Sequence, residues 1–119
     1  GEEIKLTDDT TLALNTHSVQ VGKFVTISAD DKTLTLPAVV VGASFIIVNT
    51  ASPASSKLTI SPNSNDKFLV DIAGAAGTDN KDIILAKATQ DQYDYVHLVG
   101  LSADGWLIQD VRGTWVDES

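Results

Sequence analysis

The sequence contains no cysteine, and this absence excludes several kinds of chemistry at once. Disulfide bonds, cysteine-ligated zinc, iron–sulfur clusters and thiol catalysis all require a thiol that the chain lacks. Histidine, the commonest side chain for proton transfer near neutral pH, occurs only as His17 and His97. Long apolar runs are also missing, because the longest one, residues 37–48, is interrupted by Gly42 and Ser44. A membrane-spanning helix needs roughly 20 apolar residues, so we expect none.

Positive charge is scarce. Eight lysines and arginines stand against 16 aspartates and glutamates, which gives a formal net charge of −8. No cluster of basic residues offsets this excess anywhere along the chain. Because an acidic surface repels phosphate groups, we expect neither nucleic acid nor an anionic membrane as a partner.

Valine, isoleucine, leucine and threonine dominate what is present. β-Branched side chains fit a pleated sheet better than a helix, so the composition favours strands. Hydrophobic residues make up 43% and charged residues 20% of the 119 positions, as in an ordinary folded protein. This length suits one domain with one core.

Short strand-like runs recur at intervals of about ten residues, with turn-forming residues between them. Leu34 and Leu36 alternate with threonines, which predicts a strand with one buried face. Residues 45–48 are apolar at every position, which predicts a central strand covered on both faces. The pair Asp104-Gly105 predicts a hairpin turn, since both residues tolerate positive φ. The runs lie at 19–27, 33–36, 45–48, 58–60, 68–72, 83–86, 93–99, 106–111 and 114–116.

These patterns predict an all-β fold: a small single-domain β-sandwich, jelly-roll-like, with about eight or nine short strands. The domain is expected over residues 19–119. Residues 1–18 are acidic and threonine-rich with weak patterning, which predicts an N-terminal arm outside the core.

The residues give little support to catalysis. His97 shares a strand face with Tyr95 and Val99, and that face carries no acidic residue of the same strand, which is typical of a structural or surface histidine. Ser55, Ser56 and Ser61 lie in loops without the G-x-S-x-G pattern of an activated serine. We therefore expect no catalytic residue, no enzyme activity and no cofactor.

Two polar turns, residues 63–66 and 79–82, each offer several oxygen ligands, as a hard cation such as Ca²⁺ requires. Neither has the ligand spacing of an EF-hand loop, and Lys81 adds a positive charge inside the second. Both segments are explained more simply as turns whose polar side chains are solvated. No metal site is predicted, although a cation at one of these turns stays open.

Aromatic residues are few, and four of them, Tyr93, Tyr95, Trp106 and Trp115, lie in the last third of the chain. Exposed aromatic rings stack on sugars in carbohydrate-binding faces. A small sandwich more often needs its aromatic residues in the core or in a subunit interface. Because Trp115 lies so near the end, we expect it at an interface.

Two sequence blocks resemble a known module in their order and spacing. The first block runs Ser28-Ala29-Asp30-Asp31-Lys32-Thr33-Leu34-Thr35-Leu36-Pro37 and then Gly42-Ala43-Ser44-Phe45-Ile46-Ile47-Val48-Asn49. The second runs Asp94-Tyr95-Val96-His97-Leu98-Val99 and then Asp104-Gly105-Trp106-Leu107-Ile108. This order resembles a module of tailed-bacteriophage head decoration proteins, head fibres and tail appendages, and the resemblance spans about Val19 to Val116.

The resemblance implies a non-catalytic, oligomeric virion protein. Because the chain has no attachment domain or repetitive shaft of the fibre type, we expect a capsid decoration (cement) protein, made in the host cytoplasm, on the capsid surface. It would bind the major capsid protein, stabilise the head and form a homo-oligomer, with a trimer expected first and a dimer second. The interface is expected at apolar residues of the arm and at Trp115: Ile4, Leu6, Leu12, Leu14 and Trp115.

Two other functions compete with this one. A receptor- or glycan-binding module of a phage head or tail fibre predicts exposed tryptophan or tyrosine in a groove. A small hydrolase acting on surface sugars predicts a pair of carboxylates converging in a cleft, for which no sequence pattern argues.

Overall fold

The computed structural model describes residues 3–12 and 23–119, and this part of the chain is mostly strand and loop. Leu14 and His17 lie outside the described residues. The described elements are β1 Glu3–Leu6, β2 Thr10–Thr11, β3 Lys23–Ile27, β4 Lys32–Thr35, β5 Ser44–Asn49, β6 Leu58–Ser61, β7 Lys67–Phe68, β8 Ile83–Leu85, the 3-10 helix η1 Lys87–Thr89, β9 Tyr95–Ser102, β10 Gly105–Arg112 and β11 Trp115–Asp117. No helix in these two ranges is long and apolar enough to cross a membrane.

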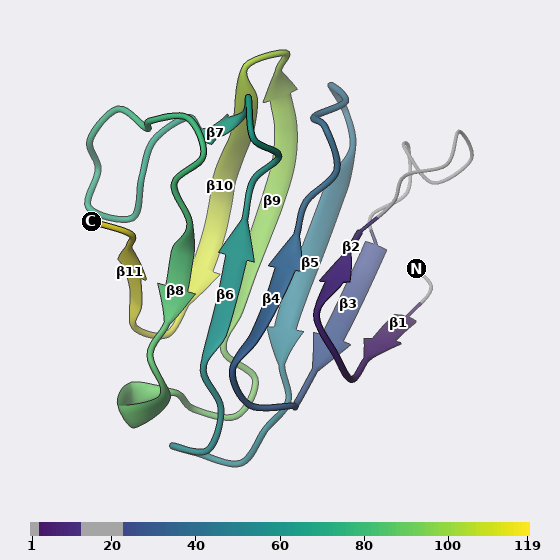
Figure 1. The fold of residues 1–119 in the computed structure, drawn as a ribbon, viewed down its shortest axis with the longest axis vertical. Coiled ribbons are helices and arrows are strands. Elements are labelled where there is room, and N and C mark those ends of the chain that lie inside the picture. The colour runs from purple at the N-terminus through teal and green to yellow at the C-terminus, as the bar shows by residue number, and fades with distance from the viewer. Residues whose placement is uncertain (1–2, 13–22) are drawn as a thin grey trace.

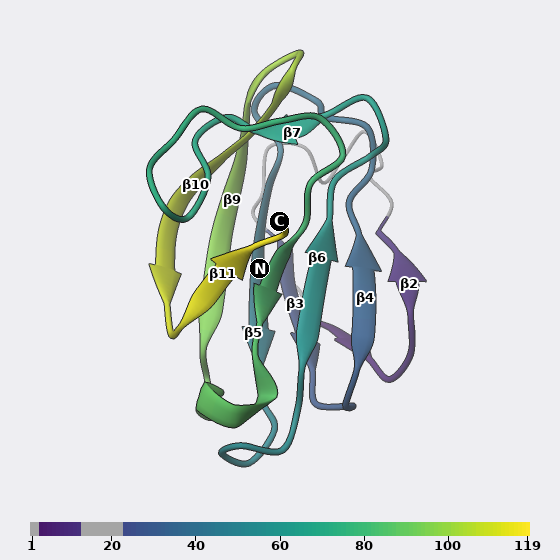
Figure 2. The same cartoon turned by 60° about the vertical axis from the view of Figure 1, so that its left-hand side comes forward.

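The strands form two sheets that pack face to face (Figure 1; Figure 2). Over the described residues, sheet A has six strands in the order β1-β3-β5-β9-β10-β7. Sheet B has five strands, counted over the same residues, in the order β11-β8-β6-β4-β2. The apolar residues of the two sheets meet between them in one core. The predicted all-β, single-domain sandwich is therefore confirmed.

From β1 to β6 the chain alternates between the two sheets, so each strand lies beside the strand two places before it (Figure 1). These neighbours are parallel: β3 pairs with β1 and β5, and β4 pairs with β2 and β6. The later pairs β5–β9, β9–β10, β6–β8 and β8–β11 are antiparallel. A jelly roll is an antiparallel architecture, so the jelly-roll detail of the prediction is not confirmed. Alternation of apolar residues identifies the buried side of a strand, but it does not identify which other strand pairs with it.

The expected N-terminal arm differs from what the structure shows over residues 3–12. β1 extends sheet A beside β3, and β2 extends sheet B beside β4. Ile4 and Leu6 point toward the core and pack against it, while Glu3 and Lys5 are exposed. These strands are short, so the sequence shows few alternating positions. Parallel pairing with β3 and β4, which are distant in sequence, brings them into the sandwich.

The core is filled by inward-facing residues of both sheets. Leu34 and Leu36 are fully buried, as predicted. Phe45 on β5 and Trp106 on β10 are also fully buried, with ring centroids 5.8 Å apart. Fully burying an apolar side chain stabilises a fold by roughly 1.5–3 kcal/mol. These rings therefore anchor the start of β10 in the core.

The hairpin between β9 and β10 is confirmed, but Gly105 is not at its centre. Ser102 pairs with Gly105, so the turn residues are Ala103 and Asp104. Gly105 is the first residue of β10, where a Cβ atom would collide with the carbonyl oxygen of Lys67 on β7. The glycine is thus required by the close approach of two strands rather than by positive φ.

Candidate functional site

Strand β5 exposes one of its two apolar sides. Phe45 and Ile47 are fully buried in the core, whereas Ile46 and Val48 lie on the opposite side and are half-buried. The prediction that this strand is central is confirmed, since β5 lies between β3 and β9. The prediction that both of its sides are covered is wrong for the single chain, because no further layer of described residues lies over sheet A (Figure 2).

Two rows of side chains cross this outer face of sheet A, at right angles to the strands. Strand pairing fixes the members of each row. Val99 and Leu107, which pair with each other, extend the apolar area toward the β9–β10 turn. From β1 to β10, the first row is Glu3, Phe24, Ile46, His97 and Asp110, and the second row is Lys5, Thr26, Val48, Tyr95 and Arg112.

An open groove of about 460 Å³ lies over these rows. Its volume falls within the range of ligand-binding sites. Tyr93 is 57% exposed and Phe24 is 41% exposed, so the groove offers aromatic surface to a partner. The lining residues combine apolar, aromatic and charged groups: Phe24, Ile46, Val48, Tyr93, Tyr95, His97, Asp110 and Arg112.

The polar end of the groove is organised by Asp110. The hydroxyl of Tyr95 donates a hydrogen bond of 2.7 Å to Asp110 Oδ2. This bond raises the pKa of Tyr95 above its ordinary value, because deprotonation would remove the donor and place two negative charges together. Asp110 also lies opposite His97 across the β9–β10 pair. The sequence pattern of β9 alone does not reveal this acidic neighbour of His97, because Asp110 lies on the paired strand β10.

Tyr93 borders the groove with an unusual backbone conformation, φ = 74°. Such a value is uncommon for a bulky residue and is held by surrounding structure. The Tyr93 N–H donates to the carbonyl of Asn49 at 2.7 Å, and the 91–94 turn that contains Tyr93 is closed by a bond from Asp91 N–H to Asp94 Oδ2. Asp94 and Asn49 are both buried, so the ring of Tyr93 projects from a fixed support.

The outer face of sheet B has a different chemical character. Pairing of its strands places hydroxyl side chains side by side across β2, β4 and β6. These residues, on the side away from the core, are Thr11, Thr33, Thr35, Thr59 and Ser61. Ile84 and Val116 add an apolar pair near β11. Hydroxyl groups remain well solvated, so exposure of this face costs less than exposure of the outer face of sheet A.

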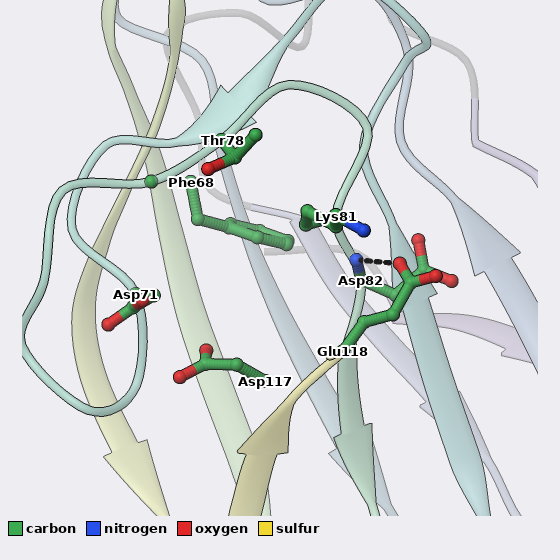
Figure 3. Close-up of a pocket in the computed structure, with 8 residues that line it drawn as sticks. Phe68, Asp71, Thr78, Lys81, Asp82, Asp117 and Glu118 are labelled. Carbon is green, nitrogen blue, oxygen red and sulfur yellow. Dashed lines mark hydrogen bonds between the residues drawn. The ribbon is translucent and has the colours of Figure 1, made fainter.

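A second, smaller cavity of about 120 Å³ lies beside β11 and contains several carboxylates (Figure 3). The carboxylate of Asp117 accepts hydrogen bonds from the N–H groups of Ile72 (2.8 Å) and Ala73 (3.1 Å). Glu118 Oε1 accepts a bond of 2.9 Å from the N–H of Asp82, which Figure 3 shows as a dashed line. These acidic groups thus tie the 69–82 segment to the end of the chain.

Asp82 has a raised pKa in this cavity. The main cause is partial burial, which disfavours the charged carboxylate, and the nearby Glu118 adds repulsion. A hydrogen bond with the Ser61 side chain acts in the opposite direction. Among residues 3–12 and 23–119, no three acidic or histidine side chains come together as a metal site would require.

The two polar turns considered as cation sites lie against each other. Asn80 donates its N–H to the carbonyl of Asp66 at 2.9 Å. Asp66 is buried, and its Oδ2 accepts the N–H of Val39 at 2.9 Å. Its carboxylate therefore fastens the 37–43 loop, which is a structural role.

The loop serines also have structural hydrogen bonds. Ser56 is fully buried and donates from its hydroxyl to the carbonyl of Ala29 at 3.1 Å. The Ser55 hydroxyl donates to the carbonyl of Ser52 at 2.5 Å. Both bonds hold the 50–57 loop in place.

Most of the residues predicted at an interface are buried or partly buried against the core of the chain itself. Leu12 and Trp115 are 4% exposed and belong to the core. The indole N–H of Trp115 donates to the carbonyl of Arg112 at 3.0 Å. Ile4 and Leu6 are partly buried against the core, and Leu14 lies outside the described residues. Their role at an interface stays a prediction.

Compared with known proteins, the chain matches no protein-family model and no curated protein sequence.

Proposed function

We propose that this protein is a non-catalytic structural subunit of a tailed-bacteriophage particle, a capsid decoration protein that binds the major capsid protein. The resemblance of its two sequence blocks to phage decoration and fibre modules supports this proposal. The structural observation that carries it is the contrast between the two outer faces. In the part of the chain that the structure describes, the outer face of sheet A is apolar at its centre and uncovered, while that of sheet B carries hydroxyl groups.

A decoration protein works within an assembly of subunits, and an apolar sheet face suits a contact with another subunit. Burial of apolar area at an interface stabilises an assembly in proportion to the area removed from water. Half-buried Ile46 and Val48 lie at the centre of the face, with Phe24 and Tyr95 beside them. A homo-oligomer would present several such subunits to a symmetric shell, so that weak contacts add up.

The absence of catalysis is part of the proposal. His97 is the histidine that lines the groove, and its neighbour Asp110 is already bonded to Tyr95. The carboxylates of the smaller cavity accept backbone hydrogen bonds and serve as structural caps. These contacts support a binding surface more than an acid–base site.

Antibody labelling of phage particles tests the proposal. An antibody raised against the purified protein is applied to tailed particles induced from the organism that carries the gene, followed by gold-labelled electron microscopy. Label over the heads is expected. Label confined to tails would favour an appendage, and particles without label would overturn a virion role.

A glycan-binding module is the second candidate, because exposed Tyr93 borders a groove that also contains Asp110 and Arg112. An aromatic ring beside charged hydrogen-bonding groups is the combination that binds sugars. Titration of the ¹⁵N-labelled protein with neutral oligosaccharides tests this function by NMR. Shifts confined to the groove and lost in Tyr93→Ala, with Val116→Ala as the control on sheet B, would support it. An unchanged spectrum at millimolar sugar would exclude those oligosaccharides as ligands.

A further inference from the structure

We propose that the outer face of sheet A binds a second copy of this chain, forming a twofold dimer in which sheet A packs on sheet A. The inference rests on the self-association proposed above and is independent of where in a particle the protein is located. To the proposed homo-oligomer it adds the surface through which two copies meet, the symmetry of the pair and the residues that face each other. Its basis is the order of charges along the two rows that cross this face.

Charged residues frame the apolar centre of the face. Glu3 and Lys5 project from β1 on one side, and Asp110 and Arg112 project from β10 on the other. In each pair the acid belongs to the first row and the base to the second. The first row therefore carries two negative charges and the second row two positive charges, so the two rows together are neutral on a chain with a formal net charge of −8. Two acidic molecules repel each other least where they meet through such a surface.

One twofold axis makes both pairs complementary. An axis that runs across the strands, between the two rows and in the plane of the contact, lays the first row of one copy over the second row of the other. Glu3 then faces the partner's Lys5, and Asp110 faces the partner's Arg112. At the centre, Ile46 faces the partner's Val48. The long side chains of lysine and arginine can take up the offset that sheet twist introduces.

The alternative twofold axis is disfavoured by the same charges. An axis parallel to the strands would lay each row over itself, with β1 over the partner's β10. Glu3 would then face the partner's Asp110, and Lys5 would face the partner's Arg112. Like charges opposed across an interface are repulsive, so the charge order selects one orientation.

The described residues of the single chain leave these cations unpaired and this apolar centre uncovered. Among the described residues, the ion pairs involve Lys32, Lys57 and Lys87, and neither Lys5 nor Arg112 takes part in one. The all-apolar run of β5 predicts a strand covered on both sides, yet residues 3–12 and 23–119 cover only one of them. A second copy supplies both the missing carboxylates and the missing apolar layer.

The size of the face sets the expected affinity. Five strands about 4.8 Å apart, each contributing about six residues, give a footprint of roughly 500 Å². The dimer would then bury on the order of 1,000 Å² in total, which is near the lower limit for a specific interface. We therefore expect a micromolar Kd and a mass that rises with concentration.

Analytical ultracentrifugation of the full chain from about 1 µM to 1 mM tests the dimer. The wild type is expected to shift from monomer to dimer over this range. Ile46→Glu, which places a charge at the centre of the face, should weaken the dimer at least tenfold. Thr59→Glu is the matched control, because Thr59 is half-buried on the outer face of sheet B, and it should leave the Kd unchanged. Circular dichroism confirms that both variants fold.

A charge swap tests the orientation. Lys5→Glu sets Glu3 opposite a carboxylate at the partner's position 5 in both symmetry-related contacts. Four carboxylates then gather where the two β1 strands meet, which should weaken the dimer several-fold. The double variant Glu3→Lys/Lys5→Glu reverses the pair but restores complementarity under the proposed axis, so it should recover most of the affinity. A swap that fails to restore binding would overturn the twofold arrangement.

Other outcomes separate this inference from the proposed function. A trimer, or a dimer that Ile46→Glu leaves intact, would overturn this interface while self-association stands. A monomer at 1 mM would overturn both the interface and self-association, and saccharide-induced shifts in the groove would then identify a sugar as the occupant. None of these results changes the labelling of phage heads, which tests the virion role separately.

Discussion

Replacing Gln90 by alanine is expected to remove the hydrogen bonds that close one end of the sandwich. Gln90 follows η1, is 1% exposed and bonds to the loop that follows β5. Its Nε2 donates to Asn49 Oδ1 (2.9 Å) and to the carbonyl of Ala51 (3.0 Å). Its Oε1 accepts the N–H groups of Ser55 (3.0 Å) and Ser56 (3.3 Å). Three of these bonds hold the loop that follows β5, and the fourth holds Asn49 at the end of that strand.

The expected cost follows from counting these bonds. A typical intramolecular hydrogen bond contributes about 1 kcal/mol net, and a buried partner left unsatisfied costs about 1–3 kcal/mol. Four bonds are lost in Gln90→Ala, and water reaches the exposed Ser55 more readily than the fully buried Asn49. We therefore expect a loss of about 3–5 kcal/mol in the free energy of unfolding, a large part of the 5–15 kcal/mol typical of a domain.

Urea denaturation followed by tryptophan fluorescence measures this loss. Gln92→Ala is the matched control, because Gln92 is exposed and donates one bond of 3.3 Å to the carbonyl of Thr50. That control should cost less than about 0.5 kcal/mol. A loss below about 1 kcal/mol for Gln90→Ala, or equal losses for both variants, would refute the role given to this network.

Two further predictions concern backbone approach and pH. Gly100→Ala places a Cβ atom against the carbonyl oxygen of Val40, so it should lower the free energy of unfolding by about 2–4 kcal/mol in the same urea assay. Gly42→Ala is the control: a Cβ atom there meets open space, and only the φ of 92° is unfavourable, so the loss should be about 1 kcal/mol. Equal costs would contradict the collision. Because the pKa of Asp82 is raised on folding, its contribution to stability is present below the ordinary value of 3.8 and is lost as the pH rises through the native pKa. Asp82→Asn cannot ionise and should gain stability relative to the wild type between pH 3 and pH 7, measured by thermal unfolding; a difference independent of pH would contradict this assignment.

The sandwich could be predicted because its signals are local. Leu34 and Leu36 alternate with threonines, and the two leucines are fully buried. The turn before Gly105 was predicted within one position, since turn chemistry depends on adjacent residues. The position of Gly105 was misjudged because its constraint comes from Lys67, which is far away in the sequence.

The candidate site was only partly predictable. The alternation of Tyr95, His97 and Val99 on one side of β9 was predicted and is confirmed. Their neighbours on that face come from other strands: Phe24 from β3 and Asp110 from β10. A sequence pattern within one strand cannot name them, because strand neighbours are chosen by packing and loop closure.

The sequence by itself determined an all-β domain, the inward and outward side of most strands, and the exclusion of thiol chemistry. These properties depend on composition and on a two-residue period that each strand carries alone. Only the tertiary structure decided that β1 to β6 alternate between sheets, that residues 3–12 join them, and that no other described segment covers the second apolar side of β5. Burial of a whole sheet face depends on which strands, distant in sequence, become neighbours. Packing of the two sheets and loop closure together determine those neighbours, so no single strand's pattern reveals them.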